Sequence, residues 1–194
     1  MTQKPKILAF AGSLRKDSFN KRLVKIAAEG ARQSGAEVTY VDLRDYPMPL
    51  YDQEIETAEG IPANAQKIKD LMIAHQGFLI SSPEYNSSVS GVLKNVIDWA
   101  SRPSKPDEVP LVCFKGKTAA LMSASVGPLG GLRGLVHLKA ILGNIDVLVM
   151  PQQHSIAKAS EVFNSEGNLK EESQQSKIVQ LGVNLVQLLK KLQG

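Results

Sequence analysis

The chain carries the stretch KILAFAGSLRKDSFN at residues 6–20, where a short apolar run passes through Gly12 into polar residues. The apolar run Lys6–Phe10 predicts a buried β-strand. From Asn20 to about Ser34 the apolar residues recur at steps of three and four, which predicts a helix. A buried strand followed at once by a helix is typical of a βαβ unit, and such units build parallel sheets.

The same alternation continues to the end of the sequence, with a proline-containing loop at Tyr46–Gln53. Further strands are predicted at Glu37–Asp42, Gly77–Ser82, Thr118–Ser123 and Asp146–Met150, and further helices at Ala63–His75, Val89–Ser101, Leu132–Leu142 and Gln174–Leu192. Short, wholly apolar strands with helical crossovers indicate an α/β protein whose doubly wound, five-stranded parallel sheet is covered on both faces. We see no linker or repeat and expect a single domain over residues 1–194.

Composition sets limits on the class of protein. The chain has 194 residues, of which 43% are hydrophobic and 22% charged, as in ordinary globular proteins. A single cysteine excludes a disulfide framework, and with three histidines it leaves no zinc cluster at ligand spacing, so we assign no metal ligands. No apolar run approaches the ~20 residues of a membrane span, and no signal peptide is recognisable, so we expect a cytoplasmic protein.

The net charge of +4 comes from one short segment. Residues 11–25 hold five basic side chains and one acidic side chain, and the rest of the chain is balanced. Lys21, Arg22 and Lys25 fall in the first turns of the predicted helix, where cations oppose the helix dipole and a bound anion would offset that cost. The alternative is an ordinary solvated surface. No second basic stretch with interleaved aromatic residues occurs, so we expect no nucleic-acid partner.

The loop Ala11–Asn20 has the composition of an anion-binding site. Free N–H groups and the dipole at a helix N-terminus favour a phosphate. The side chains of Ser13, Ser18 and Asn20 can donate hydrogen bonds, and the guanidinium of Arg15 can donate several at once. The loop lacks G-x-G-x-x-G, G-x-x-x-x-G-K-[ST] and cysteine, which excludes a dinucleotide fingerprint, a P-loop and a cysteine-dependent phosphatase. A site for one phosphate monoester remains, or an ordinary loop in which Ser18 caps the helix.

Two more loops follow strands at the same edge of the predicted sheet, where ligands bind in open α/β folds. The first, PEYNSS at Pro83–Ser88, can line a planar heterocycle with its backbone, and Tyr85 can stack on it. The alternative is a polar turn with Asn86 at positive φ. The second, SASVGPLGG at Ser123–Gly131, allows close backbone approach to a ligand and includes Ser125 as a donor. It can equally be a flexible turn without function.

Three stretches resemble the NADPH-dependent FMN reductase family, a flavodoxin-like group that includes chromate, quinone and azo-dye reductases. They are GSLRKDSFN at Gly12–Asn20, SPEYNSSVSGVLKNVIDWASRP at Ser82–Pro103 and SVGPLGG at Ser125–Gly131. The order of strands and helices is similar to that of the family over nearly the whole chain. The resemblance implies a flavodoxin-like, three-layer α/β/α fold with strand order 2-1-3-4-5.

The resemblance also implies where FMN binds non-covalently. In the first loop it implies that the phosphate is held by Ser13, Arg15, Ser18 and Asn20, and it makes Asp17 and Phe19 cofactor-binding residues as well. Along the isoalloxazine ring it implies Pro83, Glu84, Tyr85 and Asn86, with Ser87 beside them and Ser125 at the far edge of the ring. Ser90 stands where the family commonly has proline, a departure that concerns the fit of the substrate more than flavin binding.

The activity implied by the resemblance is electron transfer from NADPH or NADH through FMN to a small acceptor. The nicotinamide gives a hydride to the flavin and leaves, and the acceptor then takes its place, in a ping-pong scheme. Quinones, azo dyes, free flavin and metal oxyanions such as chromate are the acceptors implied. Because the flavin carries the chemistry, we assign no catalytic acid or base.

The resemblance further implies a homodimer or homotetramer in which a neighbouring subunit completes the pocket. One alternative function is a flavodoxin-type electron carrier that does not itself oxidise NAD(P)H. Another is an α/β regulator or scaffold without flavin. Two further residues stand out: we interpret Trp99 as a subunit contact in preference to a core residue, and Cys113 as a small buried hydrophobe.

Overall fold

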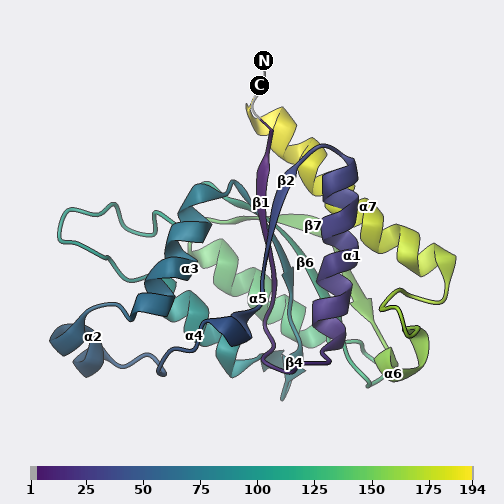
Figure 1. Cartoon of the computed structure of the whole chain (residues 1–194), viewed down its shortest axis with the longest axis horizontal. Coiled ribbons are helices and arrows are strands. Elements are labelled where there is room, and N and C mark those ends of the chain that lie inside the picture. The colour runs from purple at the N-terminus through teal and green to yellow at the C-terminus, as the bar shows by residue number, and fades with distance from the viewer. Residues whose placement is uncertain (1–3, 194) are drawn as a thin grey trace.

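The computed structural model describes residues 4–193, and its centre is a parallel sheet between two layers of helices (Figure 1). The strands are β1 (Lys6–Ala11), β2 (Glu37–Val41), β3 (Gly77–Ser81), β6 (Thr118–Ala124) and β7 (Leu148–Ile156). They lie in the order β2-β1-β3-β6-β7, and every neighbouring pair is parallel. The predicted five-stranded sheet with order 2-1-3-4-5 in three layers is therefore confirmed.

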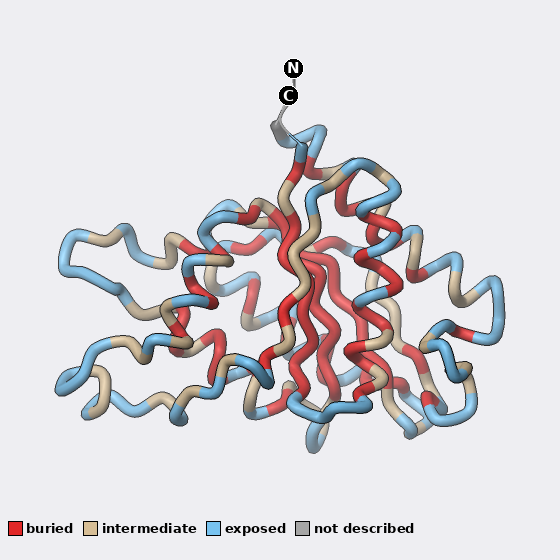
Figure 2. The backbone as a smooth tube through the Cα atoms, in the orientation of Figure 1, coloured by how far each residue is buried: buried red, intermediate tan, exposed pale blue. Residues whose placement is uncertain are grey.

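Helices cover both faces of the sheet and bury two separate hydrophobic cores. On one face lie α1 (Phe19–Gln33) and α7 (Glu172–Gln193), and on the other lie α3 (Ala63–Ala74), α4 (Gly91–Ala100) and α5 (Leu132–Asn144) (Figure 1). In β1 the side chains alternate between the two: Ile7 and Ala9 pack under α1 and α7, while Leu8 and Phe10 pack on the other side. Figure 2 shows the three central strands β1, β3 and β6 as buried along most of their length, which explains their mainly apolar sequences, whereas the edge strands β2 and β7 are only partly buried.

Several short elements were not predicted. They are the 3₁₀ helix η1 (Leu43–Asp45), helices α2 (Gln53–Glu59) and α6 (Ala159–Val162), and the hairpin formed by β4 (Glu84–Tyr85) and β5 (Ser88–Val89). Helix α2 has no buried residue, so it leaves no periodic pattern in the sequence. The hairpin follows β3 directly and becomes part of the candidate site.

The last strand differs from its prediction. The sequence predicts Asp146–Met150, whereas β7 runs from Leu148 to Ile156 and includes Pro151. The pairing with β6 shifts register: Ala119 pairs with Val149, but Leu121 pairs with Gln153. Pro151 falls within this irregularity, between the paired residues Val149 and Gln153, and it has no N–H to donate to β6. Proline is tolerated here because β7 is an edge strand.

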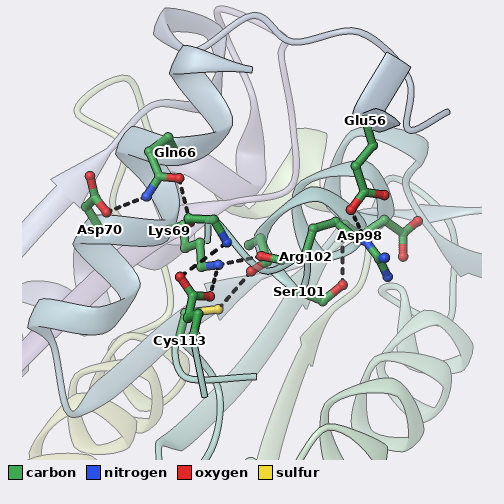
Figure 3. Close-up of polar contacts among 11 residues, drawn as sticks. Glu56, Gln66, Lys69, Asp70, Asp98, Ser101, Arg102 and Cys113 are labelled. Carbon is green, nitrogen blue, oxygen red and sulfur yellow. Dashed lines mark hydrogen bonds and ion pairs between the residues drawn. The ribbon is translucent and has the colours of Figure 1, made fainter. Parts of the chain in front are cut away.

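The segment between α4 and β6 is held to the body of the protein by buried polar contacts (Figure 3). Cys113 is fully buried and its thiol donates to the carbonyl of Ala100 at 3.1 Å, in agreement with the prediction of a small buried residue. The interpretation of Trp99 as a subunit contact is wrong. Its side chain is fully buried, and its indole N–H donates to the Pro49 carbonyl at 2.9 Å, because the chain after η1 folds over it.

Within residues 4–193, none of the helices combines the length and the apolar character that a membrane crossing requires.

Candidate functional site

The loops after β1, β3 and β6 meet at the carboxyl edge of the sheet and enclose a crevice of about 120 Å³. It is lined by nine of the residues predicted for the site: Ser13, Arg15, Ser18, Phe19, Asn20, Pro83, Glu84, Tyr85 and Ser125. Ala124 and Val126 line it too and were not predicted, since neither side chain offers a polar group. The three loops are brought together because the carboxyl ends of parallel strands meet at one edge.

Three of the predicted residues do not line the crevice. Asp17 lies on the exposed part of the first loop. Asn86 and Ser87 form the turn of the β4–β5 hairpin, with φ of 50° and 66°. Two successive positive φ angles are typical of a type I′ turn, which fixes the register of a hairpin. The backbone of Tyr85, next to this turn, is thereby held at the wall of the crevice.

One end of the crevice is rich in hydrogen-bond donors. Ser18 occupies the N-cap position of α1, but its hydroxyl makes no hydrogen bond to the helix, so the capping alternative is wrong. The first turn of α1 has no acidic residue either. Ser13 is buried, and its oxygen accepts from the N–H of Arg15 at 3.3 Å, which leaves its own O–H to donate. An uncapped helix N-terminus with two hydroxyls and a guanidinium favours a phosphate.

The side chain of Asn20 is committed mainly to the protein itself. Its amide donates to the carbonyl of Ala124 at 2.8 Å, and its oxygen accepts from the N–H of Ala124 and the hydroxyl of Ser81. These bonds tie the first turn of α1 to the carboxyl ends of β3 and β6. Asn20 therefore fixes the distance between two of the loops, and one of its amide hydrogens remains for a ligand.

Several cations of the basic segment, residues 11–25, already have partners within the protein. The ammonium of Lys21 is buried and forms an ion pair with Asp42 at 2.7 Å, so its charge is already met. Lys25 lies over the ring of Tyr40 and Arg22 over the ring of Phe19. We predicted that a bound anion would offset the unfavourable interaction of these cations with the helix dipole. For Lys21 this prediction is wrong. Arg15 is the cation of this segment that lines the crevice.

Ser90 connects the first loop to the hairpin that follows β3. Its hydroxyl is fully buried, donates to the carbonyl of Gly12 at 2.6 Å and accepts from the N–H of Leu93 at 3.3 Å. It is thus the N-cap of α4 and an anchor of the loop Ala11–Asn20 at the same time. In the sequence, Ser90 stands out only as a departure from a family pattern, and no local signal predicts its bond to the carbonyl of Gly12.

The carboxylate of Glu84 is paired with α5. It accepts from the guanidinium Nε of Arg133 at 2.8 Å and from the N–H of Gly134 at 3.2 Å. Burial by itself would raise the pKa of Glu84, but the hydrogen bonds from Arg133 and Gly134 hold that pKa below its usual value. Glu84 is the one acidic side chain among the residues lining the crevice, and Arg133 neutralises its charge. The crevice therefore suits an anionic ligand.

A second groove, of about 390 Å³, lies between α1, α7 and the segment Ser165–Asn168. Its walls carry Arg22, Lys25, Glu29 and Glu166, so cations and carboxylates are mixed in it. It contains none of the residues predicted for the site.

Known proteins are similar to this chain over most of its length. Residues 5–161 match the protein family described as NADPH-dependent FMN reductase. The NAD(P)H-dependent FMN reductase of Pseudomonas aeruginosa is 33% identical over 196 residues, and the match covers 100% of both chains. A quinone reductase of Escherichia coli is 37% identical over 150 residues, which are 77% of this chain and 76% of that one.

Solved structures show the same fold. The flavoenzyme NAD(P)H:(acceptor) oxidoreductase of Paracoccus denitrificans superimposes with a TM-score of 0.77 at 26% identity, over 96% of this chain and 98% of that one. A flavodoxin from the domain Archaea superimposes with a TM-score of 0.64 at 11% identity, over 95% of this chain and 99% of that one, which confirms the flavodoxin-like fold. The predicted use of FMN and NAD(P)H by an enzyme is confirmed with the family. In sequence and in fold, the chain belongs to the NADPH-dependent FMN reductase family.

Proposed function

We propose that the protein transfers electrons from NADPH or NADH through bound FMN to quinones. The observation that carries this proposal is the crevice itself, which is lined both by the donor-rich loop with Ser13, Arg15 and Ser18 and by Tyr85 of the β4–β5 hairpin. Relatives named for quinones support the choice of acceptor: the quinone reductase of E. coli and a 2-hydroxy-1,4-benzoquinone reductase of a Burkholderia species, which is 36% identical over 165 residues.

The residues lining the crevice fit FMN. Among them, we assign the phosphate to Ser13, Arg15, Ser18 and Asn20, with Phe19 in the same loop, and the ring to Pro83, Glu84, Tyr85 and Ser125. Asp17, Asn86 and Ser87 do not line the crevice and are proposed as cofactor-binding residues on the family resemblance alone. The oxygen of Ser125 accepts from the N–H of Gly127 at 3.2 Å, which leaves its O–H to donate to the ring. When bound, FMN supplies the redox chemistry by accepting a hydride from NAD(P)H and passing electrons on.

The size of the crevice bears on substrate access. A volume of about 120 Å³ is smaller than the roughly 300–1,000 Å³ of a pocket that encloses a whole ligand, so we expect the crevice to enclose the phosphate end of FMN and to leave the rest of the molecule nearer the surface. The flavin ring then lies at the mouth, between Tyr85 and Val126, whose side chains are 52% and 64% exposed. A ring held there has one face open to NAD(P)H and to flat acceptors. Azo dyes, free flavin and chromate belong to the same proposal as further acceptors.

The protein is proposed to act as a homodimer or homotetramer. Leu132 and Val136 are one turn apart on α5 and are 48% and 61% exposed, so they form an exposed apolar stripe on this helix. We propose that a second copy of the chain is seated on this stripe and completes the rim of the crevice. Light scattering of the purified protein measures the mass, and a monomer would contradict this part of the proposal.

Two measurements test the function. A purified protein that is yellow, or that gains a flavin spectrum with FMN, supports the assignment of the crevice, and a colourless protein that gains none contradicts it. Steady-state oxidation of NADPH in the presence of benzoquinone then separates an enzyme from an electron carrier. Failure to oxidise NADPH by a protein that holds FMN would favour the flavodoxin-type carrier.

A further inference from the structure

We propose that Glu84 is a positioning residue for the flavin ring, acting through its carboxylate on helix α5. The inference rests on the proposed function, because it concerns how the hairpin β4–β5 is held beside FMN. The family resemblance implies only that Glu84 lines the ring. Its carboxylate is instead engaged by α5, and its neighbour Tyr85 is the side chain at the mouth of the crevice.

The contacts of the carboxylate are strong ones. One oxygen accepts from both Nε and Nη2 of Arg133, and the other accepts from the backbone N–H of Gly134. The side chain of Glu84 is only 8% exposed, whereas that of Arg133 is 57% exposed. Charge-assisted bonds to a nearly buried carboxylate hold one geometry, and the exposed guanidinium adapts to it. Glu84 is therefore the fixed partner of the pair.

Helix α5 needs a cap that its own sequence does not supply. Its N-cap is Gly131 in the left-handed region, with φ of 91°. A Cβ at this position would lie 1.9 Å from the hydroxyl of Ser123, so no residue with a capping side chain fits there. A carboxylate beside the first-turn N–H groups compensates both the unpaired donors and the helix dipole. Glu84 supplies this carboxylate from another element, 50 residues away in sequence.

The hairpin lies directly on the first turns of α5. A Cβ at Gly134 would be 3.0 Å from the carbonyl oxygen of Ser88 and 3.4 Å from the Cα of Glu84. On the next turn, the Nδ1 of His137 lies 2.9 Å from the hydroxyl of Ser88. The glycine turn before α5 carries Ser125 and Val126, which line the same crevice as Glu84 and Tyr85. The Glu84 carboxylate thus sets the spacing of the hairpin and this turn, between which the ring is proposed to lie.

The experiment compares FMN with riboflavin, which lacks the phosphate, in wild type and in Glu84→Gln. Dissociation constants come from flavin fluorescence titration. We expect Glu84→Gln to weaken the binding of both flavins by the same factor, roughly 13- to 160-fold, which corresponds to one lost hydrogen bond to a charged group. At saturating flavin we also expect a shifted visible absorption band, because the ring sits in an altered environment. Arg133→Gln should reproduce both effects, and the double variant should add little.

Glu108→Gln is the matched control, because Glu108 also pairs with a cation but lies outside the crevice. It should lower the melting temperature and leave riboflavin affinity and spectrum unchanged. Unchanged riboflavin affinity in Glu84→Gln, or an equal loss in the Glu108 control, would overturn the inference. Should Glu84→Gln fail to fold, Arg133→Gln decides the question alone. If wild type binds neither flavin, it is the proposed function that fails.

Discussion

Lys69 lies inside the protein with its ammonium bonded to the carboxylate of Glu108, 39 residues further along the chain. The Lys69 side chain is 1% exposed and that of Glu108 is 12% exposed. The same ammonium donates to the carbonyl of Arg102 (Figure 3). Helix α3 thereby holds the segment between α4 and β6, which has little regular structure of its own.

Removing the carboxylate should destabilise the fold, because it leaves a buried cation without its counter-charge. We expect Glu108→Gln to lose about 3–5 kcal/mol of unfolding free energy, measured by urea denaturation. The double variant Lys69→Met, Glu108→Leu removes both charges and should recover most of this loss. A single variant as stable as wild type would contradict the importance of the pair.

The contribution of Glu108 should also depend on pH. Burial would raise the pKa of Glu108, but hydrogen bonds from Lys69 and from the Ser104 N–H lower it below the unfolded value, which is about 4.3 for glutamate. A carboxyl whose pKa is lower in the folded state stabilises the protein above its unfolded pKa and loses this effect as the pH falls through the folded value. The difference in melting temperature between wild type and Glu108→Gln should therefore be full at neutral pH and shrink below about pH 4. A difference that is constant down to pH 3 would contradict this.

Arg15 should discriminate FMN from riboflavin. Because its guanidinium lines the phosphate end of the crevice, Arg15→Ala should weaken FMN binding by about 1.5–3 kcal/mol and leave riboflavin binding unchanged. Fluorescence titration with both flavins measures the difference. Lys16→Ala is the matched control, since Lys16 is an exposed neighbouring cation that does not line the crevice. If both variants weakened FMN binding equally, Arg15 would act only through general charge attraction and not through a bond to the phosphate.

Tyr85 should affect catalysis without affecting the fold. Its side chain is half-exposed at the mouth of the crevice, and substitutions at such positions change stability by about 0.5 kcal/mol or less. We expect Tyr85→Ala to weaken ring binding or lower quinone turnover, because the aromatic face is lost. Tyr85→Phe keeps that face and should resemble wild type. Wild-type kinetics in Tyr85→Ala, at an unchanged melting temperature, would remove Tyr85 from the site.

The thiol of Cys113 should be unreactive in the folded protein. Burial raises its pKa to about 12, so the thiolate that reacts with alkylating reagents is scarce at neutral pH. We expect no labelling by iodoacetamide at pH 8 in buffer and full labelling in denaturant, as followed by mass spectrometry. Rapid labelling of the folded protein would show that the segment around Cys113 opens readily.

The central strands of the sheet were predictable because they are buried on both faces, and such burial requires an apolar run like Lys6–Phe10. The elements that were not predicted leave no such hydrophobic pattern in the sequence. The two-residue strands β4 and β5 are too short for periodicity, and α2 buries no side chain. Trp99 was misjudged because the segment that covers it, around Pro49, is close only in the folded chain.

The candidate site was predictable to the level of its three loops, since topology alone brings them to one edge. The bonds between the loops were not. Ser90 reaches Gly12 across 78 positions, and Arg133 reaches Glu84 across 49. Sequence motifs describe what a loop offers to a ligand, whereas these contacts depend on how the helices are placed around the sheet. The ion pair of Lys21 with Asp42 is hidden from the sequence for the same reason.

The two described ends of the chain lie at the edge of the sheet opposite the crevice (Figure 1). A Cβ at Gly77, at the start of β3, would touch both Leu189 near the end of α7 and Ile7 near the start of β1. Any peptide joined ahead of β1 or behind α7 therefore emerges on the far side from the crevice. A molecule tethered to an electrode through either end would turn the crevice, and with it the proposed flavin site, toward the solution, which suits it to surface electrochemistry.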